Sequence, residues 1–492
     1  MPTTPAPTAE AWLRGVAANP AAPAGVLLRL LAAPAAVAVL PILCGQRTLP
    51  AEVAEAVLAH PDPVARLAFA RNPHVDPAQR GRLAEDPDGM VRASLASGPH
   101  PRPQLARPLP DEVLDALLTA EDRPGLLSAN EIRHELAFSG QIPHSFRRRM
   151  PEHPDARLRR DSTVFWFWLT PAQRSALLAD SDPAVREAAR REQQPVDPAS
   201  LPQLSERSRY TVLTHYAVSL TLAERCLAER RDLDALARNR RIPEPVVARL
   251  VRDPDPEIRE RMADRGDLTV SQLTALIADP DPAVRTRAEL HGTAPHTWPQ
   301  CLAVNRVLGG SAEQIGPVGE LYREPETAWY AACADSPHAA LRRTAATCPL
   351  LPEQLVHRLA IDPDQDVRDL LAYNHPKAPP TLLLDAFLSS PSRRAHLLTL
   401  PRLPRTGLHH LLDHPDPQVR TLAAADPTLP SPPIPQLTDT ADTVRHAAAA
   451  NPLLPPALLE ELLLHPELAE PAAANPAHSV ARLHQLLDAS GA

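Results

Sequence analysis

Lysine is nearly absent from this chain of 492 residues, which also has few glycines, cysteines and aromatic residues. It occurs once, at Lys377, so arginine carries almost all of the positive charge. With abundant alanine, proline and leucine, this composition is typical of a GC-rich bacterial genome. The net charge of −8 argues against general nucleic-acid binding, because most nucleic-acid binders are basic overall or carry a dense basic face.

The few cysteines form no CxxC pair. Their odd number and wide spacing fit neither a disulfide framework nor a zinc site. We therefore expect a protein of the reducing cytoplasm, in which cysteine serves as a small apolar side chain. The five are Cys44, Cys226, Cys301, Cys333 and Cys348.

Signatures of common enzyme sites are also missing. The chain has no GxSxG, no GxxxxGK[ST], and no GxGxxG after a strand-like run. His410 and His414 have the four-residue spacing of metal ligands, but no HExxH is present and His414 belongs to a repeated His-Pro position. We therefore predict no enzymatic activity, no cofactor and no bound metal.

One apolar run, Val26 to Cys44, is long enough to resemble a membrane span. It contains Arg29 and is interrupted by Pro34 and Pro41, and it has no basic start typical of a secretory signal. It also lies in register with the repeats described next. We interpret it as an apolar first repeat and expect no membrane association.

The chain repeats with a period of about 26 residues. DPDPEIR at 253–259 returns as DPDPAVR at 279–285, and a similar pair of phrases lies at 60–66 and 86–92. A fixed period in this range predicts a solenoid, in which each unit buries its apolar face only against its neighbours. Near the C-terminus the arginines form a nearly regular series: Arg342, Arg368, Arg394, Arg420 and Arg445.

Each unit is predicted to be a pair of helices. Asn239 tolerates the left-handed conformation that closes a helix, and it can also cap the next one. A helix of about ten residues should then end at Asp253. Asp255 and Pro256 have the types preferred at an N-cap and at a first helical position, so a shorter helix of about seven residues, tightened toward 3-10, should follow.

These strings resemble the leucine-rich repeat variant (LRV) family and, more broadly, HEAT-like repeats. ARNPHVDPAQRGRLAEDPDGMVR at 70–92 carries the resemblance best, and ANPLLPPALLEELLLHPE at 450–467 carries part of it. The resemblance implies a right-handed α-solenoid of alternating α and 3-10 helices without enzymatic activity. Some members resemble iron–sulfur proteins with an N-terminal cysteine cluster. That region here has only Cys44, so we expect no cluster.

The repeated aspartates and arginines have a structural explanation. The aspartate is expected to cap a helix, and the arginine one turn later can bond an aspartate or carbonyl of an adjacent unit. We therefore favour scaffolding over a charged functional row.

Two segments interrupt the period and are candidates for function. TVFWFWLT at 163–170 follows a run rich in arginine, and aromatic residues beside arginines could stack bases or bind a peptide. The alternative is that the bulky residues fill a gap where the repeats change register. The second segment is a Gly-containing insert. The candidate partner-binding residues are Arg147, Arg148, Arg149, Arg159, Arg160, Phe165, Trp166 and Trp168.

The sequence thus predicts an all-α solenoid that acts as a protein-binding scaffold through its concave surface, with a protein or peptide as partner. The alternative is a nucleic-acid-binding HEAT-like protein, similar to some DNA glycosylases, that uses the basic middle region. The expected organisation is an N-terminal arm, an irregular connection, central repeats, the insert, and a C-terminal arm, at 1–190, 191–235, 236–291, 292–334 and 335–492.

Overall fold

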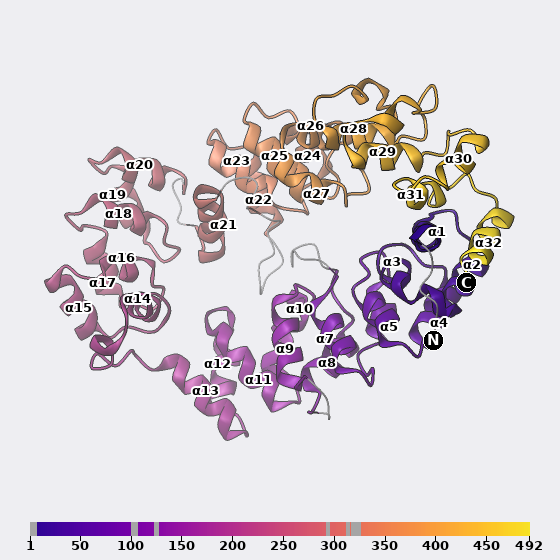
Figure 1. Ribbon diagram of the computed structural model, residues 1–492. Coiled ribbons are helices and arrows are strands. Elements are labelled where there is room, and N and C mark those ends of the chain that lie inside the picture. The colour runs from indigo at the N-terminus through magenta and orange to yellow at the C-terminus, as the bar shows by residue number, and fades with distance from the viewer. Residues whose placement is uncertain (1–6, 100–106, 123–126, 292–295, 311–314, 316–325) are drawn as a thin grey trace. The chain divides into compact units, whose positions relative to one another are not determined.

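The computed structural model describes residues 7–99, 107–122, 127–291, 296–310, 315 and 326–492. Every regular element within these ranges is an α-helix or a 3-10 helix, and successive helices pack against one another (Figure 1). The fold is therefore an all-α solenoid, as the repeats predict. Much of the predicted insert at 292–334 lies outside the described residues.

The chain forms two compact units, one made of 1–143 with 383–492 and the other of 144–382. The sequence pattern suggested divisions near 190, 235, 291 and 335. The segment 191–235, expected to be an irregular connection, contains α14 (Glu206–His215) and α15 (Leu220–Glu229). These helices share a hydrophobic core with the repeats that follow.

The residues around 250 show how the sequence builds one helix pair. Asp255 accepts a hydrogen bond from the backbone N–H of Glu257, and Pro256 fills the first turn of α18 (Pro256–Ala263), as predicted. The preceding helix, α17 (Glu244–Leu250), has seven residues and α18 has eight. The expected long–short alternation is absent here. The aspartate cap satisfies a free N–H of α18, and this second helix is α-helical rather than 3-10.

An arginine–aspartate ladder joins successive repeats. Arg259 donates to both carboxylate oxygens of Asp279, 20 residues ahead, at 2.7 and 2.9 Å, and to the carbonyl of Asp253 at 2.8 Å. Asp279 also accepts from the backbone N–H of Asp281, so it orders its own turn. The structural interpretation of the repeated Asp and Arg is confirmed. The same bidentate pairing occurs in Arg66–Asp86, Arg159–Asp180, Arg342–Asp362 and Arg420–Asp439.

A second ladder uses the repeated asparagine. Asn239 is extended (φ −77°, ψ 122°), not left-handed as expected. Its side-chain amide donates to the carbonyls of Leu213 and Tyr216 in the preceding repeat, at 2.6 and 2.8 Å. Arg265 occupies the same place one repeat later and donates to the carbonyls of Ala237 and Asn239 at 2.9 and 2.7 Å. The conserved geometry therefore belongs to the contact between repeats rather than to the helix end.

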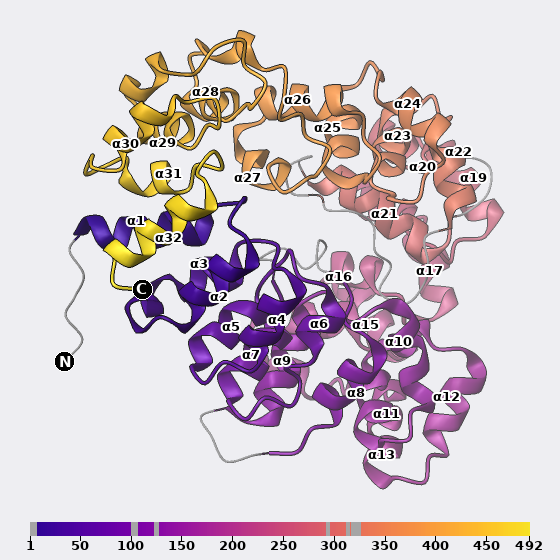
Figure 2. The same ribbon diagram turned by 90° about the vertical axis from the view of Figure 1, so that its right-hand side faces the viewer.

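The two ends of the chain continue this ladder in the first unit. Asn475 donates to the carbonyls of Ala449 and Asn451, and Asn19 in turn donates to those of Ala473 and Asn475, at 3.3 and 2.8 Å. Helix α1 (Pro7–Ala18) therefore lies against α31 (Ala469–Ala473) and α32 (Val480–Ala489), as both views show (Figures 1 and 2). The first repeat stacks on the last one as if it were the next in the series.

The apolar run at 26–44 is part of this stack. It forms α2 (Ala24–Ala32), η1 (Pro34–Val39) and α3 (Leu40–Gly45), and the chain bends by 107° between the first of these and the other two. Within the described ranges, no single helix is both long and apolar enough to cross a membrane, although this bent pair meets the criterion when its parts are combined.

Candidate functional site

Trp166, a predicted partner-binding residue, lies in the hydrophobic core. It is 6 % exposed and belongs to a cluster with Leu169, Leu177, Val185 and Ala189. Its segment, η4 (Thr163–Trp168), is a 3-10 turn broken at Phe165, where φ is −98° and ψ is 24°. The break directs neighbouring aromatic side chains differently, so Trp166 fills the space between helices while Trp168 is only half-buried.

The predicted arginines have different surroundings. Arg159 belongs to the charge ladder, where it binds Asp180, and Arg160 pairs with Asp161 at 3.1 Å. Arg147 is buried with its guanidinium 5.9 Å from the centre of the Phe165 ring. Arg148 and Arg149 are exposed at the end of α10 (His144–Arg149), and Arg149 lies 5.8 Å from the ring centre of Phe146.

Trp168 belongs to a cluster that brings three distant segments of the second unit together. The guanidinium of Arg240 lies 5.5 Å from the ring centre of Trp168 and 4.7 Å from that of Trp298. The guanidinium of Arg265 lies 5.1 Å from the ring centre of Trp298. We call Trp168, Arg240, Arg265 and Trp298 the arginine–tryptophan cluster. It joins the aromatic run to α21 (Trp298–Gly309), which begins in the segment expected as an insert.

Arg240 stands out in this cluster because it has aromatic neighbours but no carboxylate within ion-pair distance among the described residues; the nearby Asp267 binds Arg265 instead. Its side chain makes no hydrogen bond or ion pair with any residue that the structure describes. Its nitrogen atoms are not among the buried polar atoms that lack a hydrogen-bond partner. The N–H groups therefore reach solvent while the guanidinium lies against two indoles. Burial lowers the pKa of Arg240, yet arginine remains charged at neutral pH.

The surroundings hold this cluster in place. Arg265 is 2 % exposed, and it donates to both carboxylate oxygens of Asp267 at 2.8 and 2.6 Å in addition to its ladder bonds. Gly266 allows α21 to approach closely, since a Cβ atom there would lie 2.3 Å from the backbone nitrogen of Trp298. The fixed guanidinium of Arg265 and the missing side chain at Gly266 together position the indole that Arg240 contacts.

A cavity of about 610 Å³ lies beside the start of α21. Its lining includes His291, His296 and Trp329, with ring centres 4.6 Å apart for the two histidines and 5.2 Å apart for His296 and Trp329. The Nδ1 atom of His291 lies 3.9 Å from Sγ of Cys301.

This histidine–cysteine contact does not have the charge state of a catalytic pair. Burial lowers the pKa of His291 to about 3 and that of His296 to about 4, and burial raises the pKa of the Cys301 thiol to about 12. A nucleophilic cysteine needs a lowered pKa. Thiol and imidazole are therefore both neutral near pH 7. Among the described side chains, no group of three or more His, Cys, Asp or Glu is arranged to hold a metal ion.

Sequence reasoning missed Arg240 and Trp298, although one signal was present. Proline follows the ladder asparagine at Asn19, Asn72, Asn451 and Asn475, whereas arginine follows Asn239. A half-buried cation at a place usually held by a turn-forming proline is a departure from the scaffold pattern. The contact of Arg240 with Trp168 and Trp298 could not be predicted, because it depends on how segments about 60 to 70 residues away pack.

Comparisons with known proteins add little to this geometry. No protein-family model matches the chain, and no curated protein matches it. Among solved structures, Kap121p bound to Pho4p is similar over 89 % of this chain and 53 % of its own, with 16 % identity and a TM-score of 0.21. Kap121p bound to RanGTP is similar over 94 % and 54 %, with 16 % identity and a TM-score of 0.19. The chain thus spans about half the length of these proteins.

Likeness at this level says nothing about what the chain binds. The stacked helix pairs themselves show an all-α solenoid of repeated units.

Proposed function

We propose that this protein is a non-enzymatic scaffold that binds an extended, acidic protein segment at the arginine–tryptophan cluster. The observation that carries the proposal is Arg240, which lies against Trp168 and Trp298 without a carboxylate partner. Nearly every other cross-repeat arginine described above ends on a carboxylate or a carbonyl of the scaffold. An arginine held against two indoles is preorganised to form paired hydrogen bonds with a carboxylate.

A protein partner fits this surface better than a nucleic acid does. The predicted basic run does not form one basic face, because Arg147 is buried, Arg159 binds Asp180, and Arg160 binds Asp161. Affinity for nucleic acids depends on several phosphate contacts. Trp168, Trp298 and Arg240 are half-buried, and tryptophan and arginine are the residue types that most often dominate protein-binding energy.

We further infer membership of the LRV group from the repeated DPDxxVR string, and a reducing cytoplasm as the place of action. All five cysteines are free and buried, which agrees with their use as small apolar side chains.

The test measures fluorescence anisotropy with a labelled (Gly-Ser-Glu)4 peptide and its glutamine counterpart. We expect the acidic peptide to bind more tightly, and Arg240→Gln to weaken its binding about ten-fold or more, the loss of roughly 1.4 kcal/mol that a charge-assisted contact supplies. Arg252→Gln is the matched control, since Arg252 is exposed and has no side-chain partner in the described chain.

Equal binding of the two peptides, or equal loss in both variants, would contradict the proposal. A labelled 20-nucleotide DNA or RNA serves as a further probe. Sub-micromolar binding of that probe, lost in Arg240→Gln, would replace the protein scaffold with a nucleic-acid-binding function.

A further inference from the structure

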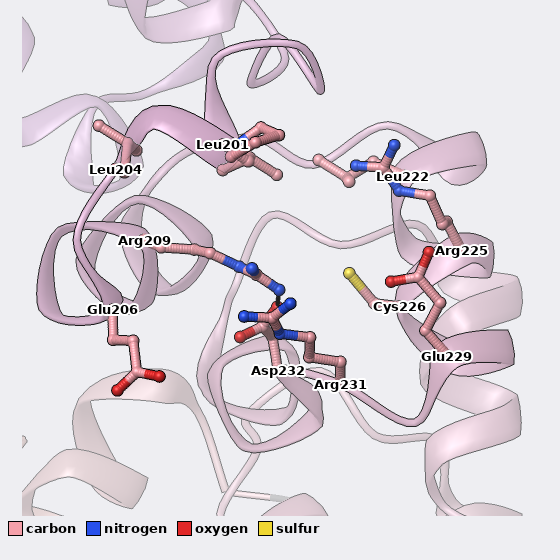
Figure 3. A pocket seen from close by; sticks show the side chains of 11 residues that line it. Leu201, Leu204, Glu206, Arg209, Leu222, Arg225, Cys226, Glu229, Arg231 and Asp232 are labelled. Atoms are coloured by element: carbon pink, nitrogen blue, oxygen red, sulfur yellow. Dashed lines mark hydrogen bonds and ion pairs between the residues drawn. The ribbon is translucent and has the colours of Figure 1, made fainter.

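A second pocket lies in the same unit. It is lined by the segment 201–204, by α14, by α15 and by the turn at 231–232 that precedes α16 (Leu233–Arg238). It has a volume of about 370 Å³, within the range of small-ligand sites. Figure 3 shows its two kinds of wall, an apolar one formed by leucines and a charged one on which several side chains converge. The apolar wall contains Leu201, Leu204 and Leu222.

The charged wall contains three arginines and three carboxylates, and two of its arginines lie unpaired at the surface. Arg209 pairs with Asp232, and both side chains are largely buried, 15 % and 20 % exposed. Arg225 and Arg231 are exposed, and neither side chain has a hydrogen-bond or ion-pair partner in the described chain. The guanidinium groups of Arg209 and Arg231 both point toward Asp232, with the Cys226 thiol facing them (Figure 3).

The backbone at this wall is unusual for the molecule. Arg230 and Asp232 have φ values of 53° and 61°, and they are the two non-glycine residues with positive φ among those described. They flank Arg231. The conformation is held by the ion pair between Arg230 and Asp253 of the ladder, at 2.5 Å, and by the bond from the Arg231 N–H to the carbonyl of Cys226 at 3.0 Å. Such strained positions concentrate at ligand-binding sites.

We propose that this pocket binds the C-terminal residue of a partner chain, with the terminal carboxylate at Arg231 and Arg209 and an apolar side chain against the leucine wall. One ligand residue must supply both the carboxylate and the apolar side chain, because the charged wall and the leucine wall face the same small cavity. An internal aspartate or glutamate places its carboxylate on its own side chain and leaves the leucine wall without a partner. Capture of a terminal carboxylate is a recurrent mode of peptide recognition.

The rim explains why one carboxylate is preferred to several. Glu206 and Glu229 also line the pocket and have no ion-pair partner in the described chain. Their charges balance those of Arg225 and Arg231, so the lining has no net positive charge with which to hold a second acidic group. The ligand class is therefore a peptide ending in a residue such as leucine, without an acidic residue immediately before it.

This inference rests on the proposed function only in taking a protein as the partner, since none of its residues belongs to the arginine–tryptophan cluster. Its test uses saturation-transfer NMR, which detects weak binding of small probes. The probes are N-acetyl-L-leucine, N-acetyl-L-leucinamide, which lacks the carboxylate, and N-acetylglycine, which lacks the apolar side chain. We expect N-acetyl-L-leucine to bind saturably and at least ten-fold more tightly than either of the others.

Variants assign this binding to the pocket. Arg231→Gln should weaken binding of N-acetyl-L-leucine at least five-fold, whereas Arg252→Gln should leave it unchanged. Arg240→Gln should also leave it unchanged, so failure here and failure of the acidic-peptide test are separate outcomes. Unaltered thermal unfolding of Arg231→Gln would show that the fold is intact, as expected for an exposed side chain. Binding of the amide as tight as that of the acid, or full affinity in Arg231→Gln, would overturn the proposal.

Discussion

His291 occupies a ladder position but does not make the ladder bond. It lies 26 residues after Arg265, which itself lies 26 after Asn239, and both of those side chains donate to carbonyls of the preceding repeat. The Nε2 atom of His291 is buried and has no hydrogen-bond partner among the residues that the structure describes, while Nδ1 faces Cys301. The polar connection between repeats is therefore interrupted at this residue, next to the histidine-lined cavity.

The presence of histidine at this ladder position should make the stability of the region sensitive to acid. The pKa of His291 is lowered by burial to about 3, whereas it is about 6.5 in the unfolded chain. At a pH between these two pKa values, His291 is protonated in the unfolded chain but neutral in the folded chain. The free energy of unfolding therefore falls as the pH drops below about 6.5. At pH 5 the loss from His291 is about 2 kcal/mol, from 1.4 kcal/mol per pH unit. Hydrogen exchange of the α20 (Pro282–Glu289) and α21 amides at pH 7 and 5 measures it.

Nearby groups modify this effect, and a variant isolates it. His296, with a pKa lowered by burial to about 4, adds acid sensitivity of the same sign. Asp264 acts in the opposite direction, because burial raises its pKa to about 6, and its protonation stabilises the fold as the pH falls through that value. His291→Asn restores the residue found at position 239 and should reduce the acid-induced rise in exchange. An unchanged pH dependence in this variant would show that His291 is not the source.

Two aspartates that look alike in the sequence precede helix α20 and have different structural roles. Asp281 is its N-cap and accepts hydrogen bonds from the N–H groups of Ala283 and Val284. Asp279 connects two repeats through Arg259, with side chains only 6 % and 12 % exposed. The hydrogen bond from Arg259 holds the pKa of Asp279 below its usual value.

Removing these two aspartates should therefore have unequal costs. Asp281→Ala removes a cap and should cost about 1 kcal/mol. Asp279→Ala leaves the Arg259 guanidinium without its partner and should cost about 3 kcal/mol, as when one member of a buried pair is removed. Because each repeat contacts only its neighbours, hydrogen exchange should rise around α18 and α20 and stay unchanged near α25 (Gln365–Asn374).

A double-mutant cycle gives the control. Arg259→Ala should remove most of the additional cost of Asp279→Ala, since the unpaired charge is then gone. Equal costs for the two aspartates, or loss of protection spread over the whole chain, would contradict a ladder that acts between neighbouring repeats.

The sequence was a sufficient guide to the helix caps, but not to helix lengths or to most contacts between repeats. The cap at Asp255 follows from residues within three positions of one another, and it was predicted correctly. Asn239 does end its own helix, α16, as predicted, but the partners of its side-chain amide lie about 25 residues away in the preceding repeat and were not foreseen. Arg240 was missed because its partners, Trp168 and Trp298, come from segments with no common pattern.

At the scale of the whole chain, the pairing of its two ends solves a problem common to solenoids. Terminal repeats expose an apolar face and normally need a polar capping unit. Here α1 buries Leu13, Val16 and Ala17, and its residue Arg14 pairs with Glu470 at 2.8 Å. The indole N–H of Trp12 donates to the carbonyl of Leu463 at 2.8 Å. Each end of the chain therefore covers the other, which a repeat pattern read along the sequence does not reveal.

Two glycines of the first repeat provide a matched test of this pairing. A Cβ atom at Gly15, in α1, would lie 2.3 Å from the carbonyl oxygen of Glu470 and 2.5 Å from Cβ of Ala473, whereas one at Gly25, in α2, would meet nothing within 4 Å. Gly→Ala in a helix ordinarily stabilises by roughly 0.5–1 kcal/mol. Gly25→Ala should therefore stabilise the protein.

Gly15→Ala should instead destabilise it by about 1–3 kcal/mol, because the added methyl group meets backbone that cannot move aside without opening the contact between α1 and α31. Denaturant unfolding gives the two signs, and hydrogen exchange should rise in α31 and α32, more than 450 residues away in the sequence, only for Gly15→Ala. If both variants stabilise the protein and exchange in α31 is unchanged, the ends of the chain do not pack together in solution. Gly15→Ala and Gly25→Ala are therefore expected to change the free energy of unfolding in opposite directions. The difference arises because the first repeat stacks on the last one at Gly15.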